Sequence, residues 1–101
     1  MSPSLALLVA DLVADLPDVR SSIDGASTTW SLGARPFGVL GPDGMELRLD
    51  PAIAAAAART PDTAPSSRGR EWVRFNPREL DAHAVDRLTA WLDLAYRRAA
   101  T

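Results

Sequence analysis

The sequence has no cysteine, no lysine and only one histidine. Without cysteine it can form no disulfide framework, no thiolate nucleophile and no cysteine metal site. All 11 basic residues are arginines and alanine is abundant, which we interpret as the bias of a high-GC genome, plausibly actinobacterial. Arginine enrichment is therefore weak evidence of function in this chain.

The chain also lacks an excess of positive charge and any long hydrophobic run. Its formal net charge of −2 does not favour a nucleic acid or an anionic membrane as partner. No apolar run reaches the roughly 20 residues that span a bilayer. Residues 1–17 are apolar, but they have no positive start and contain Asp11 and Asp15, so we expect no signal sequence and a cytoplasmic protein. The 101 residues predict a single domain.

Motifs for catalysis, phosphate binding and metal binding are missing. The sequence contains no G-x-S-x-G, G-x-G-x-x-G or G-x-x-x-x-G-K-[ST] pattern, and its carboxylates are not spaced as metal ligands. A small hydrolase could pair Ser66 or Ser67 with His83, but His83 is expected in the exposed first turn of a helix. We therefore predict no catalytic residue, no cofactor and no metal.

The first predicted helix begins near residue 3 and ends before Pro17. Ser2 is a suitable N-cap, Pro3 suits the first helical position, and Pro17 disfavours helix in the residue before it. Apolar residues recur at helical spacing and form one face for the core. They are Leu5, Leu8, Val9, Leu12, Val13 and Leu16.

A longer helix is predicted from about Ala82 to the end of the chain. Asp81 is its expected cap, and Leu80 with Val85 is spaced as a hydrophobic staple. Arg97 and Arg98 are expected to complement the negative end of the helix dipole. The predicted core stripe is Val85, Leu88, Leu92, Ala95 and Ala99, widened by Trp91 and Tyr96.

Between these helices the pattern predicts short strands, one short helix and a loop. Turn sequences at 24–26 and 41–44 separate expected strands at 19–23, 27–32, 35–40 and 45–49. Asp50 and Pro51 begin a predicted alanine-rich helix over 50–59. Residues 60–69 are expected to be the longest irregular segment, and 70–75 the last strand. The fold class is thus α+β, with two layers and a mostly antiparallel sheet.

The stretch 68–74 carries the candidate binding residues Arg68, Arg70, Trp72 and Arg74. Residues 59–78 have five arginines against two acids, whereas residues 1–50 have three arginines against seven acids. Three interpretations stay open: an anion site, acidic and basic regions that face each other within or between subunits, and a solvated edge. In the predicted strand, Glu71, Val73 and Phe75 share one face, and Trp72 and Arg74 lie on the other. We expect all three tryptophans to pack in or near the core, although an exposed Trp72 would fit an interface.

The helix ending in "LPDV", the "W-V-x-F" strand and the final "AWLDLAYRRA" together resemble the MmcQ/YjbR-like small bacterial proteins. The segment "ELRLDPAIAAAAARTPDT…EWVRF" also resembles small actinobacterial proteins labelled as a luciferase domain, a label that does not imply light emission. The first resemblance implies a fold similar to type III secretion chaperones, in the order α-β-β-β-α-β-β-α. It implies no established activity and no site residues. Some members are labelled DNA-binding, but the charge balance of this chain does not favour that function.

The sequence as a whole predicts a non-enzymatic binding or interaction domain that self-associates or binds another protein. The alternative is a domain that binds a small molecule or anion on the sheet face around Trp72 and Arg74. DNA association and hydrolysis are the weaker hypotheses.

Overall fold

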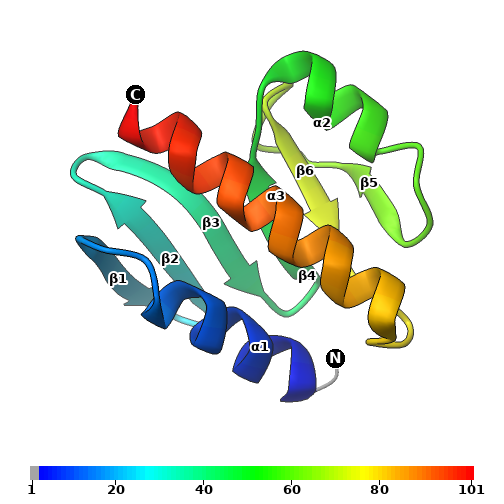
Figure 1. The fold of residues 1–101 in the computed structure, drawn as a ribbon, viewed down its shortest axis with the longest axis horizontal. Coiled ribbons are helices and arrows are strands. Elements are labelled where there is room, and N and C mark those ends of the chain that lie inside the picture. Colours follow the sequence, from blue (N-terminus) through cyan, green and yellow to red (C-terminus); the bar gives the residue numbers. More distant parts are fainter. Residues whose placement is uncertain (1–2) are drawn as a thin grey trace.

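The structure is a computed structural model that describes residues 3–101, with side chains from Leu5 onward. The predicted cap at Ser2 lies outside the described residues. Three helices and six strands follow one another along the chain (Figure 1). They are α1 (Pro3–Ala14), β1 (Val19–Asp24), β2 (Ser27–Leu32), β3 (Arg35–Gly41), β4 (Gly44–Arg48), α2 (Pro51–Ala57), β5 (Thr63–Pro65), β6 (Trp72–Phe75) and α3 (Ala82–Ala100).

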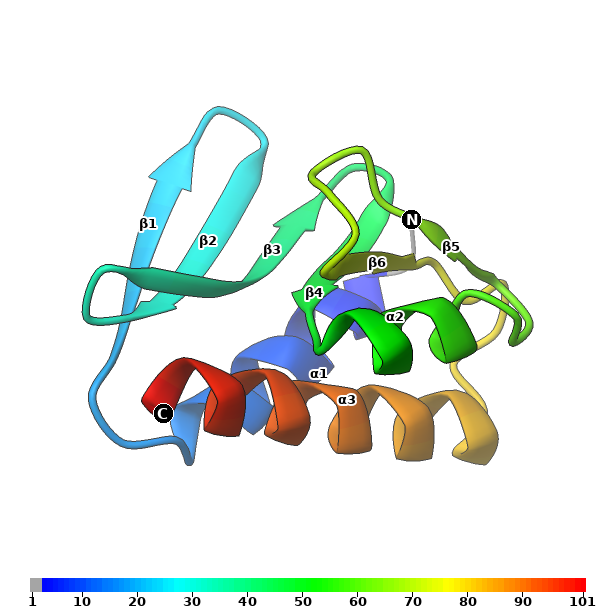
Figure 2. The same cartoon turned by 90° about the horizontal axis from the view of Figure 1, so that it is seen from above.

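The six strands form one antiparallel sheet in the order β1-β2-β3-β4-β6-β5. Helices α1 and α3 lie on the same side of this sheet (Figure 2), and α3 contacts β2, β3 and β4. The short helix α2 packs against β5 and β6. The predicted α+β fold with two layers is confirmed.

The core lies between the sheet and the helices. Most of its fully buried residues lie on the faces that alternation and helical periodicity predicted, whereas Phe37 lies in a strand for which no buried face was predicted. Among the largest are Leu5, Val9, Phe37, Met45, Leu47, Leu49, Val73, Phe75, Leu88 and Leu92. In α3, Ala84 is buried and Val85 is only half-buried, so the stripe begins one residue earlier than predicted.

Both predicted caps of the later helices are confirmed. The Asp50 carboxylate accepts a hydrogen bond from the Ala52 N–H at 3.0 Å, and the Asp81 carboxylate accepts one from the Ala84 N–H at 2.9 Å. These bonds satisfy N–H groups that have no partner inside the first turn of a helix.

The prediction of an irregular segment over residues 60–69 is wrong in part. Residues 63–65 form β5, which pairs with β6 in the register Thr63↔Phe75, Ala64↔Arg74 and Pro65↔Val73. The prolines and hydroxyl side chains of this segment are turn formers, but the neighbouring strand β6 supplies hydrogen-bond partners that the local sequence does not reveal. The segment 66–71 returns the chain to β6.

Two of the three tryptophans pack in or against the core, as predicted. Trp30 is buried in the core. Trp91 is half-buried and packs edge-on against the Phe75 ring, with the two ring centroids 5.5 Å apart. Trp72 is half-buried but does not belong to the core cluster of the described residues.

Candidate functional site

The structure distributes the four sequence-predicted candidates over separate places. Arg68 forms an intramolecular ion pair, because its Nε lies 3.0 Å from the Glu46 carboxylate. Its Cζ also lies over the Trp72 ring, 5.7 Å from the ring centroid. Ser66 also donates a hydrogen bond to Glu46. Arg68 therefore fastens the 66–71 segment to β4.

Arg70 and Trp72 line a hollow between α2 and the residues around β5. Its volume is about 540 Å³, and Arg70 is the only charged residue that lines it. The other lining residues are Pro51, Ala52, Ala54, Ala55, Ala58, Pro65 and Gly69. This hollow is mostly apolar, so it lacks the converging donors that an anion needs.

Arg74 lies in a different hollow, of about 500 Å³, on the exposed side of β6. The predicted alternation is confirmed, since Val73 and Phe75 are buried and Arg74 is exposed. Arg74 and Arg78 share this hollow with Asp43 and Asp62, and Arg78 pairs with Asp62 at 3.7 Å. The two acids offset the two arginines.

The charge asymmetry of the sequence is resolved only in part. Of the seven acids in residues 1–50, only Glu46 forms an ion pair among the described side chains, and its partner is Arg68. Among the described side chains, the acidic first half thus meets the basic segment at the Glu46–Arg68 pair and in the hollow that Asp43 shares with Arg74. Pairing between subunits stays a prediction.

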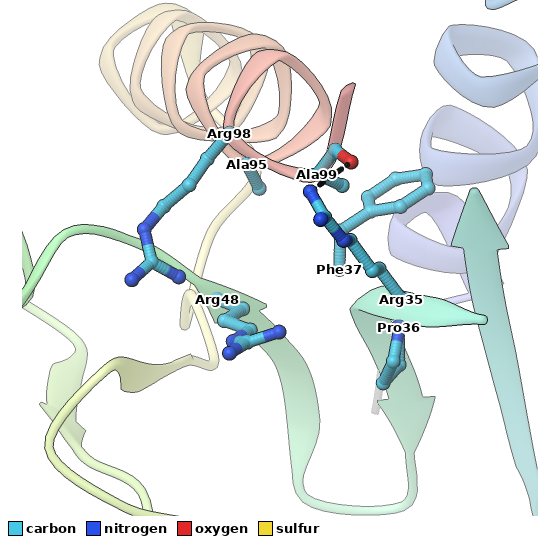
Figure 3. A pocket seen from close by; sticks show the side chains of 7 residues that line it. All are labelled: Arg35, Pro36, Phe37, Arg48, Ala95, Arg98 and Ala99. Carbon is cyan, nitrogen blue, oxygen red and sulfur yellow. Dashed lines mark hydrogen bonds between the residues drawn. The ribbon is translucent and has the colours of Figure 1, made fainter. Parts of the chain in front are cut away.

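A group of arginines that the sequence did not suggest surrounds a third cavity. Arg35 from β3, Arg48 from β4 and Arg98 from α3 line a cavity of about 350 Å³ (Figure 3). They are its only charged lining residues. The rest of the lining consists of Pro36, Phe37, Ala95 and Ala99. We call this the arginine cavity.

Arg35 fastens the end of α3 to the sheet. Its Nη1 donates to the backbone oxygen of Ala99 at 3.3 Å and to that of Thr101 at 2.6 Å. Backbone oxygens in the last turn of a helix lack partners within the helix, so a guanidinium is well placed there. Arg97 and Arg98 lie in the last turn of α3, as predicted, and in addition Arg97 pairs with Asp93 and Arg98 with Glu71.

Glu71 lies between two arginines of this group. It accepts hydrogen bonds from the Nη2 of Arg98 and from the Nη2 of Arg48, the latter at 3.4 Å. The hydrogen bond from Arg98, followed by the positive charges of Arg48 and Arg98, outweighs desolvation and lowers the pKa of Glu71. Its charged form therefore links β4, β6 and the end of α3.

No local signal in the sequence could have identified the arginine cavity. Its three arginines are far apart in the chain, and each had a separate explanation: a strand start, the polar face of a strand, and a helix end. Their meeting depends on the β3–β4 pairing and on α3 crossing the sheet. The sequence favoured 68–74 because its charges lie close together in the chain, but β6 begins only at Trp72, and the irregular segment 66–71 places Arg68 and Arg70 elsewhere.

His83 is exposed and lines a hollow with residues that include Thr60, Asp62 and Asp81, but no serine among the described residues. Ser66 is instead hydrogen-bonded to Glu46. Among the described residues, no three His, Asp or Glu side chains form a group that could hold a metal ion. No helix in residues 3–101 is both long and apolar enough to cross a membrane.

No family model, curated protein or solved structure matches this chain. The resemblance to the MmcQ/YjbR-like proteins therefore stays a prediction. The structure has four strands before α2, whereas that resemblance implies three.

Proposed function

We propose that this chain is a non-enzymatic interaction domain that self-associates by pairing the free edges of two β1 strands. The observation that carries this proposal is the state of β1. It is one of the two edge strands of the sheet, and five of its six residues are exposed. A free edge strand without proline presents unpaired backbone groups to another chain.

The hairpin geometry identifies which backbone groups of β1 are free. Asp24 and Ser27 close a two-residue loop in which Gly25 has a φ of 61°, as in the tight turns of β-hairpins. The closing pair of such a loop exchanges hydrogen bonds, and the pattern alternates along an antiparallel pair. The N–H and C=O groups of Val19, Ser21 and Ile23 therefore point outward.

A second copy of the same strand complements this edge in charge. If a two-fold axis passes between the Ser22 residues of two copies, Ser21 of each copy lies opposite Ile23 of the other. The backbone groups of both residues point outward, as an antiparallel ladder between the copies requires. Arg20 of each copy would then lie opposite Asp24 of the other. An axis at Ser21 would oppose Asp18 with Asp24, which are both acidic, and an axis at Ile23 would leave Arg20 without an acid. Charge selects the axis at Ser22.

The same arrangement gives Ile23 a partner. Its side chain is 79% exposed, the largest exposure among the big apolar residues described. With the axis at Ser22, the two Ile23 side chains become diagonal neighbours across the new strand pair. Diagonal pairs lie within reach of each other, so association removes apolar surface from water.

The test is sedimentation of the wild type and of a Ser21→Pro variant over a wide concentration range. The Ser21 N–H faces outward, so proline removes no hydrogen bond of the β1–β2 pair but blocks the new one. We expect a concentration-dependent dimer for the wild type, a monomer for Ser21→Pro, and an unchanged dimer for the matched Ser21→Ala variant. Circular dichroism checks that the variants fold.

Two results would contradict the proposal. One is a wild type that stays monomeric at the highest concentration. The other is a folded Ser21→Pro variant that dimerises as strongly as the wild type, because association would then use another surface.

The alternative function predicted from the sequence, anion binding around Trp72 and Arg74, has less support from the geometry. Trp72 and Arg74 line different hollows, and the hollow of Arg74 contains two acids.

A further inference from the structure

We propose that the arginine cavity binds a small organic acid. The oxyanion group of this ligand, a carboxylate or a phosphate, would contact the guanidinium groups of Arg35, Arg48 and Arg98. Its compact apolar body would contact the partly exposed Pro36 and Ala99. This proposal uses a different surface from β1 and does not depend on self-association.

The first argument is charge. Three arginines line the cavity, and Glu71 at its margin is the only carboxylate that pairs with any of them among the described side chains. Among the described side chains around the cavity, arginines thus exceed carboxylates by two. Guanidinium groups are weakly hydrated and suit the binding of carboxylate and phosphate groups.

The second argument is the number of free donors. Arg35 uses its Nη1 for the two backbone oxygens, whereas Arg48 and Arg98 each use Nη2 for Glu71. Within the described part of the chain, each guanidinium keeps its Nε and one Nη without a protein partner. A guanidinium presents its donors as a planar fork that binds an oxyanion in a bidentate manner.

The third argument is the shape and rigidity of the apolar wall. Phe37 is fully buried, and its ring packs edge-on against Tyr96 with the centroids 5.8 Å apart. Phe37 and Ala95 have almost no exposed surface, so they support Pro36 and Ala99, which form the apolar surface that is open to a ligand. A volume of about 350 Å³ lies at the lower end of the range for small-molecule sites, roughly 300–1,000 Å³. The ligand is therefore the size of a substituted benzene ring rather than a nucleotide.

The other hollows fit this chemistry less well. The Trp72 hollow has one charged residue, Arg70, which is exposed. The Arg74 hollow opposes two arginines with two aspartates. Among these three hollows of the described residues, the arginine cavity has the largest excess of arginines over carboxylates.

Nuclear magnetic resonance titration of the wild type with benzoate, phenyl phosphate and neutral benzamide tests the proposal. At constant ionic strength we expect benzoate or phenyl phosphate to shift the Nε–H signals of Arg35, Arg48 and Arg98 and the methyl signal of Ala99, whereas benzamide should not. The stronger of the two anions identifies the preferred oxyanion. Saturable shifts centred on Arg74, or no saturable shift with either anion, would overturn the proposal.

Variants provide the second arm of the test. Arg35→Gln and Arg48→Gln should each weaken binding of the preferred probe about tenfold or more, because each removes charged hydrogen bonds to the ligand. The matched control is Arg74→Gln, which should leave the affinity unchanged. Equal affinity in all three variants would overturn the proposal. The wild-type shift map keeps the test decisive even if one variant does not fold.

Discussion

The two ends of the sheet are built in opposite ways. At the β1–β2 end, β1 is largely exposed and nothing lies within 4 Å of the Cβ position of the turn residue Gly25. At the other end, β5 is only three residues long and ends in Pro65, and α2 packs against it. A short edge strand that contains proline and lies under a helix is protected from pairing with another chain.

Ion pairs follow the same division. All five ion pairs of the described side chains join residues from Glu46 onward. The packed end of the sheet is therefore held by ion pairs between distant segments, whereas the β1–β2 hairpin is held by its short turn, its pairing with β3 and the packing of Trp30 in the core. The packed β5 end suits stability, and the exposed β1 end suits association.

The largest effect is expected for Gly44→Ala, compared with Gly25→Ala. Gly44 is buried with a φ of 116°, and a Cβ there would lie 2.5 Å from the Phe75 carbonyl oxygen. Backbone strain and overpacking together should cost about 3 kcal/mol or more of unfolding free energy. Gly25→Ala has the same kind of backbone strain without the clash and should cost roughly 1–2 kcal/mol.

Urea unfolding followed by circular dichroism measures both values. Equal losses in the two variants would mean that the two ends are packed equally tightly, which would remove the basis of the comparison. Gly33→Ala is a further control, since Gly33 also has a positive φ and no neighbour within 4 Å of its Cβ position.

The packed end is also where sequence and structure differ most. Helices α1 and α3, the hairpin strands and the caps at Asp50 and Asp81 were predictable, because periodicity, turn residues and capping residues act within a few positions of one another. Strand β5 was not, because Thr63–Pro65 becomes a strand only through its pairing with β6. The arginine cavity was not predictable for the same reason: it depends on the spatial order of β3, β4 and α3, whereas the sequence shows only neighbours along the chain.

The second prediction concerns the register of the proposed β1 pairing. Arg20→Asp would place two like charges opposite each other at both ends of the strand pair and should weaken the dimer by up to about tenfold. The double variant Arg20→Asp/Asp24→Arg restores opposite charges and should recover the wild-type affinity. Sedimentation at low salt measures the three dissociation constants.

We expect neither substitution to destabilise the monomer. Arg20 and Asp24 lie opposite Ser31 and Ser27 on β2 and form no ion pair among the described side chains. If the single and double variants dimerise with the same affinity, the axis does not lie at Ser22. The two β1 strands would then have to pair in another register.

The smallest effect is expected for the ion pairs of Glu71 at the packed end. Because the hydrogen bond from Arg98 lowers the pKa of Glu71 in the folded protein below its ordinary value of 4.5, the carboxylate stabilises the fold above that value. This contribution decreases as the pH falls from 4.5 through the lowered folded pKa. The stability difference between the wild type and Glu71→Gln should therefore shrink between neutral and acidic pH.

Unfolding free energies at several pH values, at low and high salt, measure this contribution. About a third of each side chain in these pairs is exposed, so screening keeps the effect small and added salt should reduce it further. Glu79→Gln, which removes an exposed acid without an ion pair among the described side chains, is the matched control. A difference between the wild type and Glu71→Gln that stays constant with pH would show that the arginines hold this end through their contacts with the backbone and their packing. The stability of the packed end would then not depend on the charge of Glu71.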